Sequence, residues 1–188
     1  MSSDSFLLPN AQIDALGSAM VKGFPQSYDW PALQRFLAAA ARGAPTLVTP
    51  VYSHEIFDIV VGARHRFDAP DLLIVEGLNL LQAPPAAPVD LLSHLDRSIY
   101  LHAPAEVLQR WFVDRFLDSW RGATPDSFYA QFAALDAAEV EALARWTWSE
   151  INEPNLRDHI EPTRSRAALV VYLAPDHSIE RVELQRGR

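Results

Sequence analysis

Three short apolar runs rich in β-branched residues constrain the fold of this chain more than any other feature. They cover residues 72–75 (LLIV), 98–101 (SIYL) and 168–173 (ALVVYL). The first and third are almost continuously apolar, which is typical of strands buried on both faces of a parallel sheet. Residues 179–184 instead alternate apolar and polar side chains, and this pattern predicts a half-exposed edge strand.

Helical segments lie between these runs. Residues 31–41 begin with proline in the first turn and are followed by Gly43, a pair of signals for the start and the end of a helix. Residues 104–120 form a second predicted helix, and Asp136 caps a third over residues 137–151. Strands that alternate with helices predict an α/β fold, with a mainly parallel sheet flanked by helices.

Length and composition agree with one globular domain over residues 1–188. Of these residues 49% are hydrophobic, and a chain of this length buries roughly 70% of its unfolded surface. The absence of cysteine excludes disulfides, thiolate zinc sites and cysteine nucleophiles. A net charge of −8 with scattered arginines argues against a nucleic-acid binder. No apolar run approaches the roughly 20 residues that span a membrane, so we expect a cytoplasmic protein.

Two charged residues occupy positions where an α/β fold can place a ligand. Glu76 directly follows residues 72–75, and ligands collect at the carboxyl ends of parallel strands. Its carboxylate either holds magnesium or caps a neighbouring loop. Arg115 falls in line with Val107 and Trp111 at helical spacing, which predicts that it lies on the apolar side of the helix. A guanidinium there needs an anion, either a substrate phosphate or an internal carboxylate.

Polar side chains elsewhere suit the recognition of a small molecule. Tyr52 and His54 lie on one side of the chain if the segment is extended, and His54 is either a general base or a structural histidine. Asn152 follows the third predicted helix, where its amide either caps the helix end or binds a ligand. The spacing of the six histidines indicates no metal cage. Asp4 lies where an α/β domain usually has its first functional loop, yet only three residues precede it.

Together these segments resemble the bacterial type I pantothenate kinases, a branch of the P-loop kinases related to uridine kinase and phosphoribulokinase. The matching stretches are collinear and cover residues 3–10, 22–29, 50–54, 70–82, 110–117, 125–128, 150–152 and 162–167. The resemblance implies a truncated P-loop kinase-like domain with three layers. It also implies phosphorylation of pantothenate by ATP with Mg²⁺, the committed step toward coenzyme A, together with a homodimer and coenzyme A as an inhibitor.

The resemblance also implies roles for individual residues. Asp4 falls on the family's base, which takes the proton of the substrate hydroxyl, and Arg115 falls on an arginine that faces phosphate. Glu76 matches the acidic residue on the ATP and Mg²⁺ side. The positions on the pantothenate side are Tyr52, His54, Phe112, Tyr129 and Asn152.

The chain departs from the family at three places. Phe112 replaces a tyrosine that donates a hydrogen bond to pantothenate, and Ser119 replaces a pocket phenylalanine. None of the seven glycines has the Gly-x-x-x-x-Gly-Lys-Ser/Thr spacing, and the single lysine, Lys22, lies outside any such motif. That loop supplies the backbone N–H groups that cradle the phosphates, so we expect the chain alone to be a very poor kinase.

Three hypotheses follow from the match and its departures. In the first, the chain is the C-terminal two-thirds of a pantothenate kinase. In the second, it is a non-catalytic protein that binds pantothenate or coenzyme A or forms a dimer. In the third, which rests on Phe112 and Ser119, it belongs to a kinase for a related hydroxylated substrate.

Overall fold

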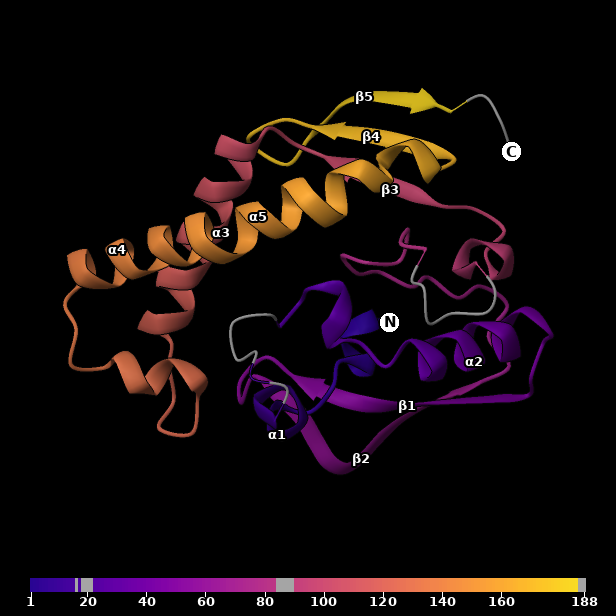
Figure 1. Cartoon of the computed structure of the whole chain (residues 1–188), viewed down its shortest axis with the longest axis horizontal. Coiled ribbons are helices and arrows are strands. Elements are labelled where there is room, and N and C mark those ends of the chain that lie inside the picture. The colour runs from indigo at the N-terminus through magenta and orange to yellow at the C-terminus, as the bar shows by residue number, and fades with distance from the viewer. Residues whose placement is uncertain (16, 18–21, 84–89, 186–188) are drawn as a thin grey trace.

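The computed structural model describes residues 1–15, 17, 22–83 and 90–185. Helices and short sheets alternate along the chain, so the predicted α/β class is confirmed (Figure 1). Among the described residues, no helix has both the length and the apolar character that crossing a membrane requires. The helices are α1 (Asn10–Ala15), α2 (Trp30–Ala41), α3 (Ala105–Arg121), α4 (Ala137–Thr147) and α5 (Glu153–Asn155), and the strands are β1 (Thr46–Ser53), β2 (Asp58–Asp68), β3 (Ile99–His102), β4 (Leu169–Leu173) and β5 (Ile179–Leu184).

Helix α2 forms where the sequence predicts it. The Asp29 side chain accepts a hydrogen bond from the Ala32 amide at 2.9 Å and caps the first turn. Leu33 and Leu37 are each only 1% exposed and lie in the same hydrophobic core as Leu47 of β1. The α2 helix therefore closes one side of the N-terminal core.

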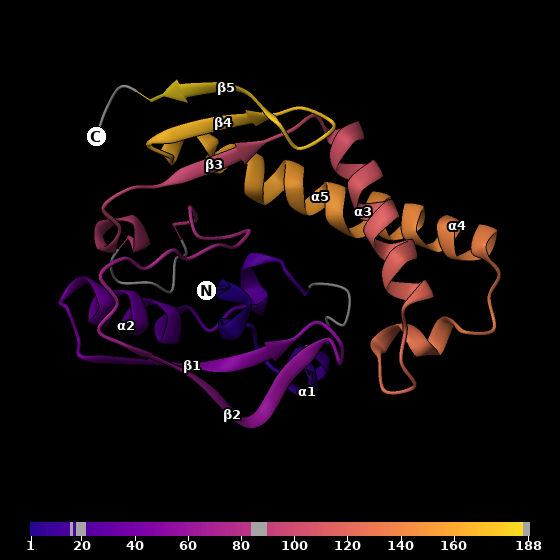
Figure 2. The same cartoon turned by 180° about the vertical axis from the view of Figure 1, so that it is seen from behind.

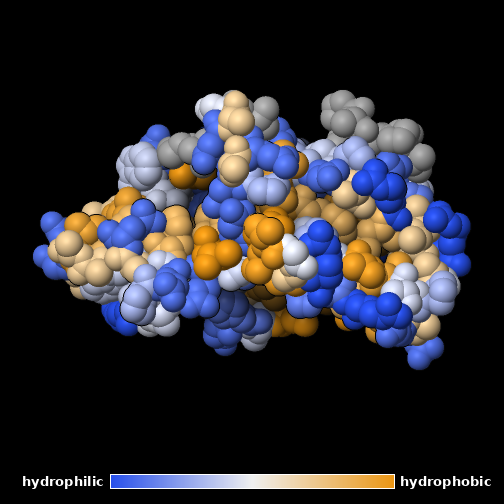
Figure 3. Space-filling model, turned by 90° about the horizontal axis from the view of Figure 1, so that it is seen from below, coloured by the Kyte–Doolittle hydropathy of each residue, from blue (hydrophilic) through white to orange (hydrophobic). Residues whose placement is uncertain are grey.

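Strands β1 and β2 form a long antiparallel hairpin that the sequence analysis did not predict. The pairing runs from Thr46–Asp68 to Ser53–Asp58 and is irregular between Pro50 and Val51. When the molecule is seen from below, where the hairpin faces the viewer, hydrophobic residues lie among hydrophilic ones (Figure 3). Val61 of β2 is 97% exposed. The hairpin matters for the site because its turn begins next to Tyr52.

A second sheet has the order β3-β4-β5. Strands β3 and β4 are parallel, and β4 and β5 are antiparallel. These strands correspond to the runs predicted over residues 98–101, 168–173 and 179–184. The edge position of β5 is confirmed, since β4 is its neighbour in the described sheet. Parallel pairing between named strands is restricted to β3 and β4, which is less than the mainly parallel sheet we expected.

Residues 72–75 differ from the prediction, because they do not form a regular strand. Around them, the Ser3 amide donates to the Glu76 carbonyl at 2.7 Å and the Glu76 amide donates to the Met1 carbonyl at 2.9 Å. These bonds form one isolated parallel bridge. The side chains of Leu72 and Ile74 are 78% and 68% exposed. Burial on both faces, which the apolar run predicts, is therefore not found in the described structure.

The third predicted helix begins as expected and continues much further. Asp136 and Glu139 form a capping box at the start of α4. Instead of ending at residue 151, the helical path continues through a π-helical turn at Trp148–Asn152, α5, a second π-helical turn and a 3-10 segment that ends at Arg166. Pro154 lies within this path, directly after the first π-helical turn, where its missing amide hydrogen interrupts the helical hydrogen-bond ladder. Figure 2 shows this long helical path crossing α3.

Candidate active site

Asp4 lies in the short 3-10 turn Ser3–Phe6. Ser2 caps this turn, with its hydroxyl accepting a hydrogen bond from the Asp4 amide at 3.2 Å. The Tyr28 hydroxyl donates to Asp4 Oδ1 at 3.3 Å. Burial raises the pKa of the Asp4 carboxyl above its usual value of 3.8, against a lowering by His54, while Glu76 raises it further. A carboxyl group with a raised pKa is a better proton acceptor than an ordinary aspartate.

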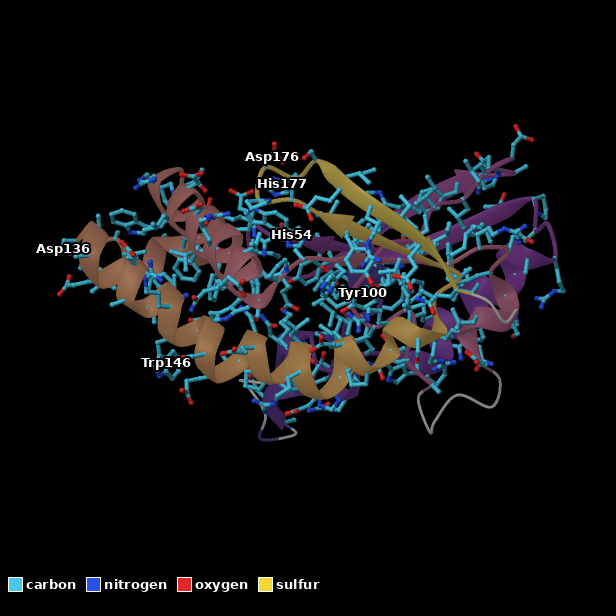
Figure 4. The ribbon with its side chains drawn as sticks, turned by 90° about the horizontal axis from the view of Figure 1, so that it is seen from above. His54, Tyr100, Asp136, Trp146, Asp176 and His177 are labelled. Carbon is cyan, nitrogen blue, oxygen red and sulfur yellow. The ribbon has the colours of Figure 1, made fainter. Side chains whose placement is uncertain are left out.

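Tyr52 and His54 lie beside Asp4. His54 Nε2 is 4.0 Å from Asp4 Oδ2, and the His54 side chain is 76% exposed. The Tyr52 and His54 rings meet edge to face with centroids 5.0 Å apart, which agrees with the expectation that they share one side of an extended segment. Burial raises the pKa of Tyr52, so its hydroxyl keeps its proton and can donate. His54 lies near the middle of the molecule when it is viewed from above (Figure 4).

Lys22 is the main site residue that the sequence analysis missed. Its Nζ donates to the Asn10 side-chain oxygen and to the Phe57 carbonyl. The ammonium also lies 5.1 Å from the centroid of the Tyr52 ring and 4.7 Å from that of Phe57. Burial lowers the pKa of Lys22, while Asp58 and Asp4 raise it. The only sequence signal was the resemblance of residues 22–29, which gave this lysine no role.

Two buried amides hold the residue that follows Lys22. Asn79 Nδ2 and Asn155 Nδ2 both donate to the Gly23 carbonyl, at 2.8 and 3.1 Å. Asn79 is 2% exposed and Asn155 is 5% exposed. Gly23 adopts the left-handed backbone conformation with φ of 89°, and its amide donates to Ser27 Oγ at 3.0 Å. This arrangement, which we call the Gly23 clamp, fixes the loop that carries Lys22.

Phe57 connects the hairpin turn to the aromatic residues after α3, which are Phe128, Tyr129 and Phe132. It has a φ of 54°, a conformation that is uncommon for a bulky residue. Its carbonyl accepts a hydrogen bond from Asn10 Nδ2 at 3.1 Å. Its ring stacks on Phe128, with centroids 4.7 Å apart. The Phe128 amide in turn donates to the Glu55 carbonyl at 2.6 Å, so the loop after α3 lies against the hairpin turn.

The prediction that Arg115 lies on the apolar side of its helix is wrong. Arg115 is exposed, while Val113 and Phe116 form the buried stripe of α3 and pack against α4. Spacing from Val107 through Trp111 placed Arg115 in the apolar row, but Trp111 itself is only partly buried. An exposed guanidinium needs no internal carboxylate. Of the two partners predicted for Arg115, the internal carboxylate is therefore not required.

Phe112 and Tyr129, which the resemblance implies for the pantothenate side, both contact other aromatic rings. Phe112 contacts Trp148, with ring centroids 6.0 Å apart. Tyr129 meets Phe116 edge to face at 5.2 Å and is close enough to Tyr52 to influence its pKa. Asn152 is partly buried, and its side chain makes no capping hydrogen bond, since the helical path continues beyond it. Of the two roles predicted for the Asn152 amide, capping the helix end is therefore not observed.

The backbone bridge between Ser2 and Glu76 brings Glu76 near Asp4, two residues after Ser2. The carboxylates of Glu76 and Asp4 interact electrostatically. The described residues contain no cluster of three or more His, Asp or Glu side chains that would hold a metal ion by themselves. Magnesium bound together with a nucleotide needs only one or two carboxylates, because phosphates and waters supply the other ligands. The Glu76 carboxylate fits that role.

The sequence of this chain is similar to those of known proteins. No protein-family model matches the chain. Pantothenate kinase of Clavibacter sepedonicus is 44% identical over 189 residues, that of Streptomyces avermitilis 42% over 195 and that of Yersinia enterocolitica 40% over 193. Each alignment includes 99% of this chain. In sequence, this chain is a relative of the pantothenate kinases. It spans 59 to 61% of the length of these pantothenate kinases.

Solved structures show the same fold at low sequence identity. D-glycerate 3-kinase from Cryptococcus neoformans aligns with a TM-score of 0.64 at 13% identity, covering 98% of this chain and 78% of that one. Phosphoribulokinase from Rhodobacter spheroides aligns with a TM-score of 0.56 at 16% identity, covering 92% and 58%. These neighbours show a P-loop kinase fold over the region that they share with this pantothenate kinase relative.

Proposed function

We propose that this chain carries the pantothenate-binding and proton-accepting part of an ATP-dependent pantothenate kinase. Such an enzyme transfers a phosphoryl group from ATP to the terminal hydroxyl of pantothenate, the first step of coenzyme A biosynthesis. One observation carries the proposal: the partly buried Asp4 carboxyl, with its raised pKa, lies 4.0 Å from His54 and within the same group as Tyr52 and Lys22. The names of the relatives support it.

Asp4 takes the hydroxyl proton in this proposal. Phosphoryl transfer depends mainly on positioning and charge neutralisation, with a carboxylate to orient the attacking hydroxyl. Tyr28 donates to Oδ1 of Asp4 and so fixes the plane of the carboxylate. Oδ2, the oxygen nearer to His54, would accept the hydrogen bond and then the proton of the substrate hydroxyl.

The surrounding donors suit an anionic substrate rich in hydroxyl and amide groups. Lys22 contributes a positive charge, and Tyr52 and His54 contribute hydrogen-bond donors on the same side. Asn152 would add an amide, and Tyr129 an aromatic wall near Tyr52. Phe112 would contribute apolar contact alone, because it has no hydroxyl.

ATP and Mg²⁺ belong to the same proposal. Mg²⁺ neutralises the charge of the phosphates during transfer, and Glu76 would hold it. Exposed Arg115 would face the phosphates. The proposal also includes a homodimer and inhibition by coenzyme A, which the family resemblance implies. A cytoplasmic location is part of it as well.

Calorimetry on the chain with pantothenate tests the proposal. We expect binding that weakens at least tenfold in His54→Ala, because His54 lies beside Asp4 and Tyr52. His65→Ala is the matched control, since His65 is an exposed histidine of the same hairpin, on β2. Absence of pantothenate binding together with binding of D-glycerate would favour the kinase for another hydroxylated substrate, the reading that Phe112 motivates.

A non-catalytic pantothenate or coenzyme A binder is the second candidate. It needs only the substrate-side positions Tyr52, His54 and Asn152, which the chain contains. Transfer of labelled phosphate from ATP to pantothenate separates the two candidates. Turnover that disappears in Asp4→Asn supports the catalytic proposal, whereas binding without any turnover, alone or with the remaining part of a kinase added, supports the binder.

A further inference from the structure

Helix α2 and strand β1 enclose a groove beside the N-terminal core. In Figures 1 and 2, α2 runs alongside β1. The space between them has a volume of about 320 Å³, at the lower end of the range of about 300–1,000 Å³ that is typical of small-molecule sites. Among the described residues, none of Asp4, Tyr52 and His54 lines it. This space, which we call the α2–β1 groove, is therefore a different place from the candidate active site.

The floor of the α2–β1 groove is apolar. Phe6 and Phe36 line it and are only 5% and 6% exposed, and their ring centroids lie 5.4 Å apart. Ala32 and Ala39 line it from α2, before and after Phe36 in the helix. Side chains this small leave room beside the two rings for an apolar group of a ligand.

The pairing of β1 with β2 shows which charged residues lie beside the groove. Leu47 of β1 points into the N-terminal core. Successive side chains of a strand point to opposite faces, so Val48 and Pro50, which line the groove, lie on the outer face of the hairpin. Their cross-strand partners are Arg66 and Arg64. Residues directly opposite each other project to the same face, so both arginines lie on the face where the groove opens.

The groove carries positive charge that the described residues do not neutralise. Arg66 pairs with Asp68, with Nε 2.8 Å from Oδ1, and its Nη2 donates to Thr46 Oγ1 at 3.0 Å. Arg35, which lines the groove from α2, and Arg64 are both exposed. Neither forms an ion pair with another residue in the described part of the chain. Two free guanidinium groups beside one groove contrast with the net charge of −8 of the whole chain.

We propose that the α2–β1 groove binds a small organic anion, an apolar group with a carboxylate or phosphate head. The apolar group lies on Phe6 and Phe36, and the head meets Arg35 and Arg64, because a planar guanidinium matches either head with two parallel hydrogen bonds. An ion pair in water contributes little by itself, so binding requires both parts of the ligand. Phe6 belongs to the same 3-10 turn as Asp4, so the bound anion contacts the turn that carries the proposed base.

Titrations of the full chain followed by NMR test this proposal. Hydrocinnamate and phenyl phosphate are the probes, and the tighter of the two identifies the head group. We expect saturable shifts of the amide signals of Phe6, Arg35 and Val48. Arg35→Gln should weaken binding of the tighter probe roughly fivefold or more, since charge-assisted hydrogen bonds are lost. Arg97→Gln is the matched control, because Arg97 is exposed and does not line the groove.

A second variant places a negative charge in the groove. Val48 is 51% exposed, so Val48→Glu should leave the melting temperature unchanged while it repels the anionic head. We expect it to weaken binding at least as much as Arg35→Gln does. Binding that tolerates both variants would overturn the proposal.

The neutral and truncated analogues decide the rest. Neutral hydrocinnamyl alcohol or acetate that binds as tightly as the anionic probes would overturn the proposal, as would the absence of saturable shifts with either probe. Self-association of the chain that Arg35→Gln abolishes would assign the α2–β1 groove to a second copy instead. The titrations require neither ATP nor pantothenate, so their failure is distinguishable from failure of the proposed kinase function.

Discussion

The carboxyl group of Asp4 is partly buried, and this burial decides how its charge affects stability. Burial raises its pKa above 3.8, so the folded protein binds this proton more tightly than the unfolded chain does. The stability that this group contributes is therefore fully present below pH 3.8 and is lost as the pH rises through the folded-state pKa. At neutral pH the ionised side chain destabilises the fold.

Asp4→Asn should therefore raise the melting temperature at pH 7. The amide oxygen still accepts the Tyr28 hydrogen bond, while the desolvated charge is removed. The difference from the wild type should shrink as the pH falls toward 3.8. Thermal melts across this range measure it, with exposed Asp71→Asn as the control that should change little. A lower melting temperature for Asp4→Asn at pH 7 would contradict the argument.

Lys22→Met tests whether the ammonium binds substrate. Methionine keeps an unbranched apolar stem between Tyr52 and Phe57 but removes the charge. A hydrogen bond to a charged group contributes about 1.5–3 kcal/mol, so pantothenate affinity should fall roughly tenfold or more. Calorimetry measures the change, with exposed Arg42→Met as the control. Unchanged affinity with a lower melting temperature would make Lys22 a structural residue of the hairpin turn.

At the scale of elements, the Gly23 clamp connects three distant segments. Gly23→Ala should destabilise the protein by about 1–2 kcal/mol, the cost of a left-handed conformation for a residue with a side chain. The added methyl group would meet nothing within 4 Å, so the cost is in the backbone. Gly122→Ala is the matched control, because Gly122 has a φ of −90°. Urea denaturation compares the two variants, and equal effects would show that the clamp does not depend on φ.

Elements with local signals were predictable from the sequence, and elements that depend on distant partners were not. Helix α2 carries its own proline and cap, and β5 carries its own alternation, so both were found. The β1–β2 hairpin was missed because its strands contain Pro50, Arg64 and Arg66, and only mutual pairing stabilises the strands. Residues 72–75 had a strand-like composition, but a strand also needs bonded neighbours, and one bridge forms there.

The candidate site divides in the same way. Tyr52 and His54 could be grouped from sequence because they are two residues apart on one extended segment. Arg115 was misplaced because helical spacing gives a row of residues without saying which row faces the core. Lys22 was missed because its contacts come from Asn10 and Phe57, which lie 12 and 35 residues away. No local pattern records such contacts.

At the scale of the whole molecule, the buried residues fall into separate clusters. One lies around α2 and β1 and includes Leu37, and another lies between α3 and α4 and includes Val140. No buried residue is shared between these two clusters. Elements that pack in different clusters can open separately, because stability is not uniform across a structure.

Leu37→Ala should therefore loosen one region and spare the other. Leu37 is 1% exposed, and leucine-to-alanine changes in a core cost about 2–5 kcal/mol. Hydrogen exchange measured by mass spectrometry should accelerate in α2 and β1 and remain unchanged in α3 and α4. Val140→Ala, at a residue that is 0% exposed, should give the reverse pattern. Uniform acceleration in both variants would instead show one cooperative unit, in which the two clusters stabilise each other through the segments that join them.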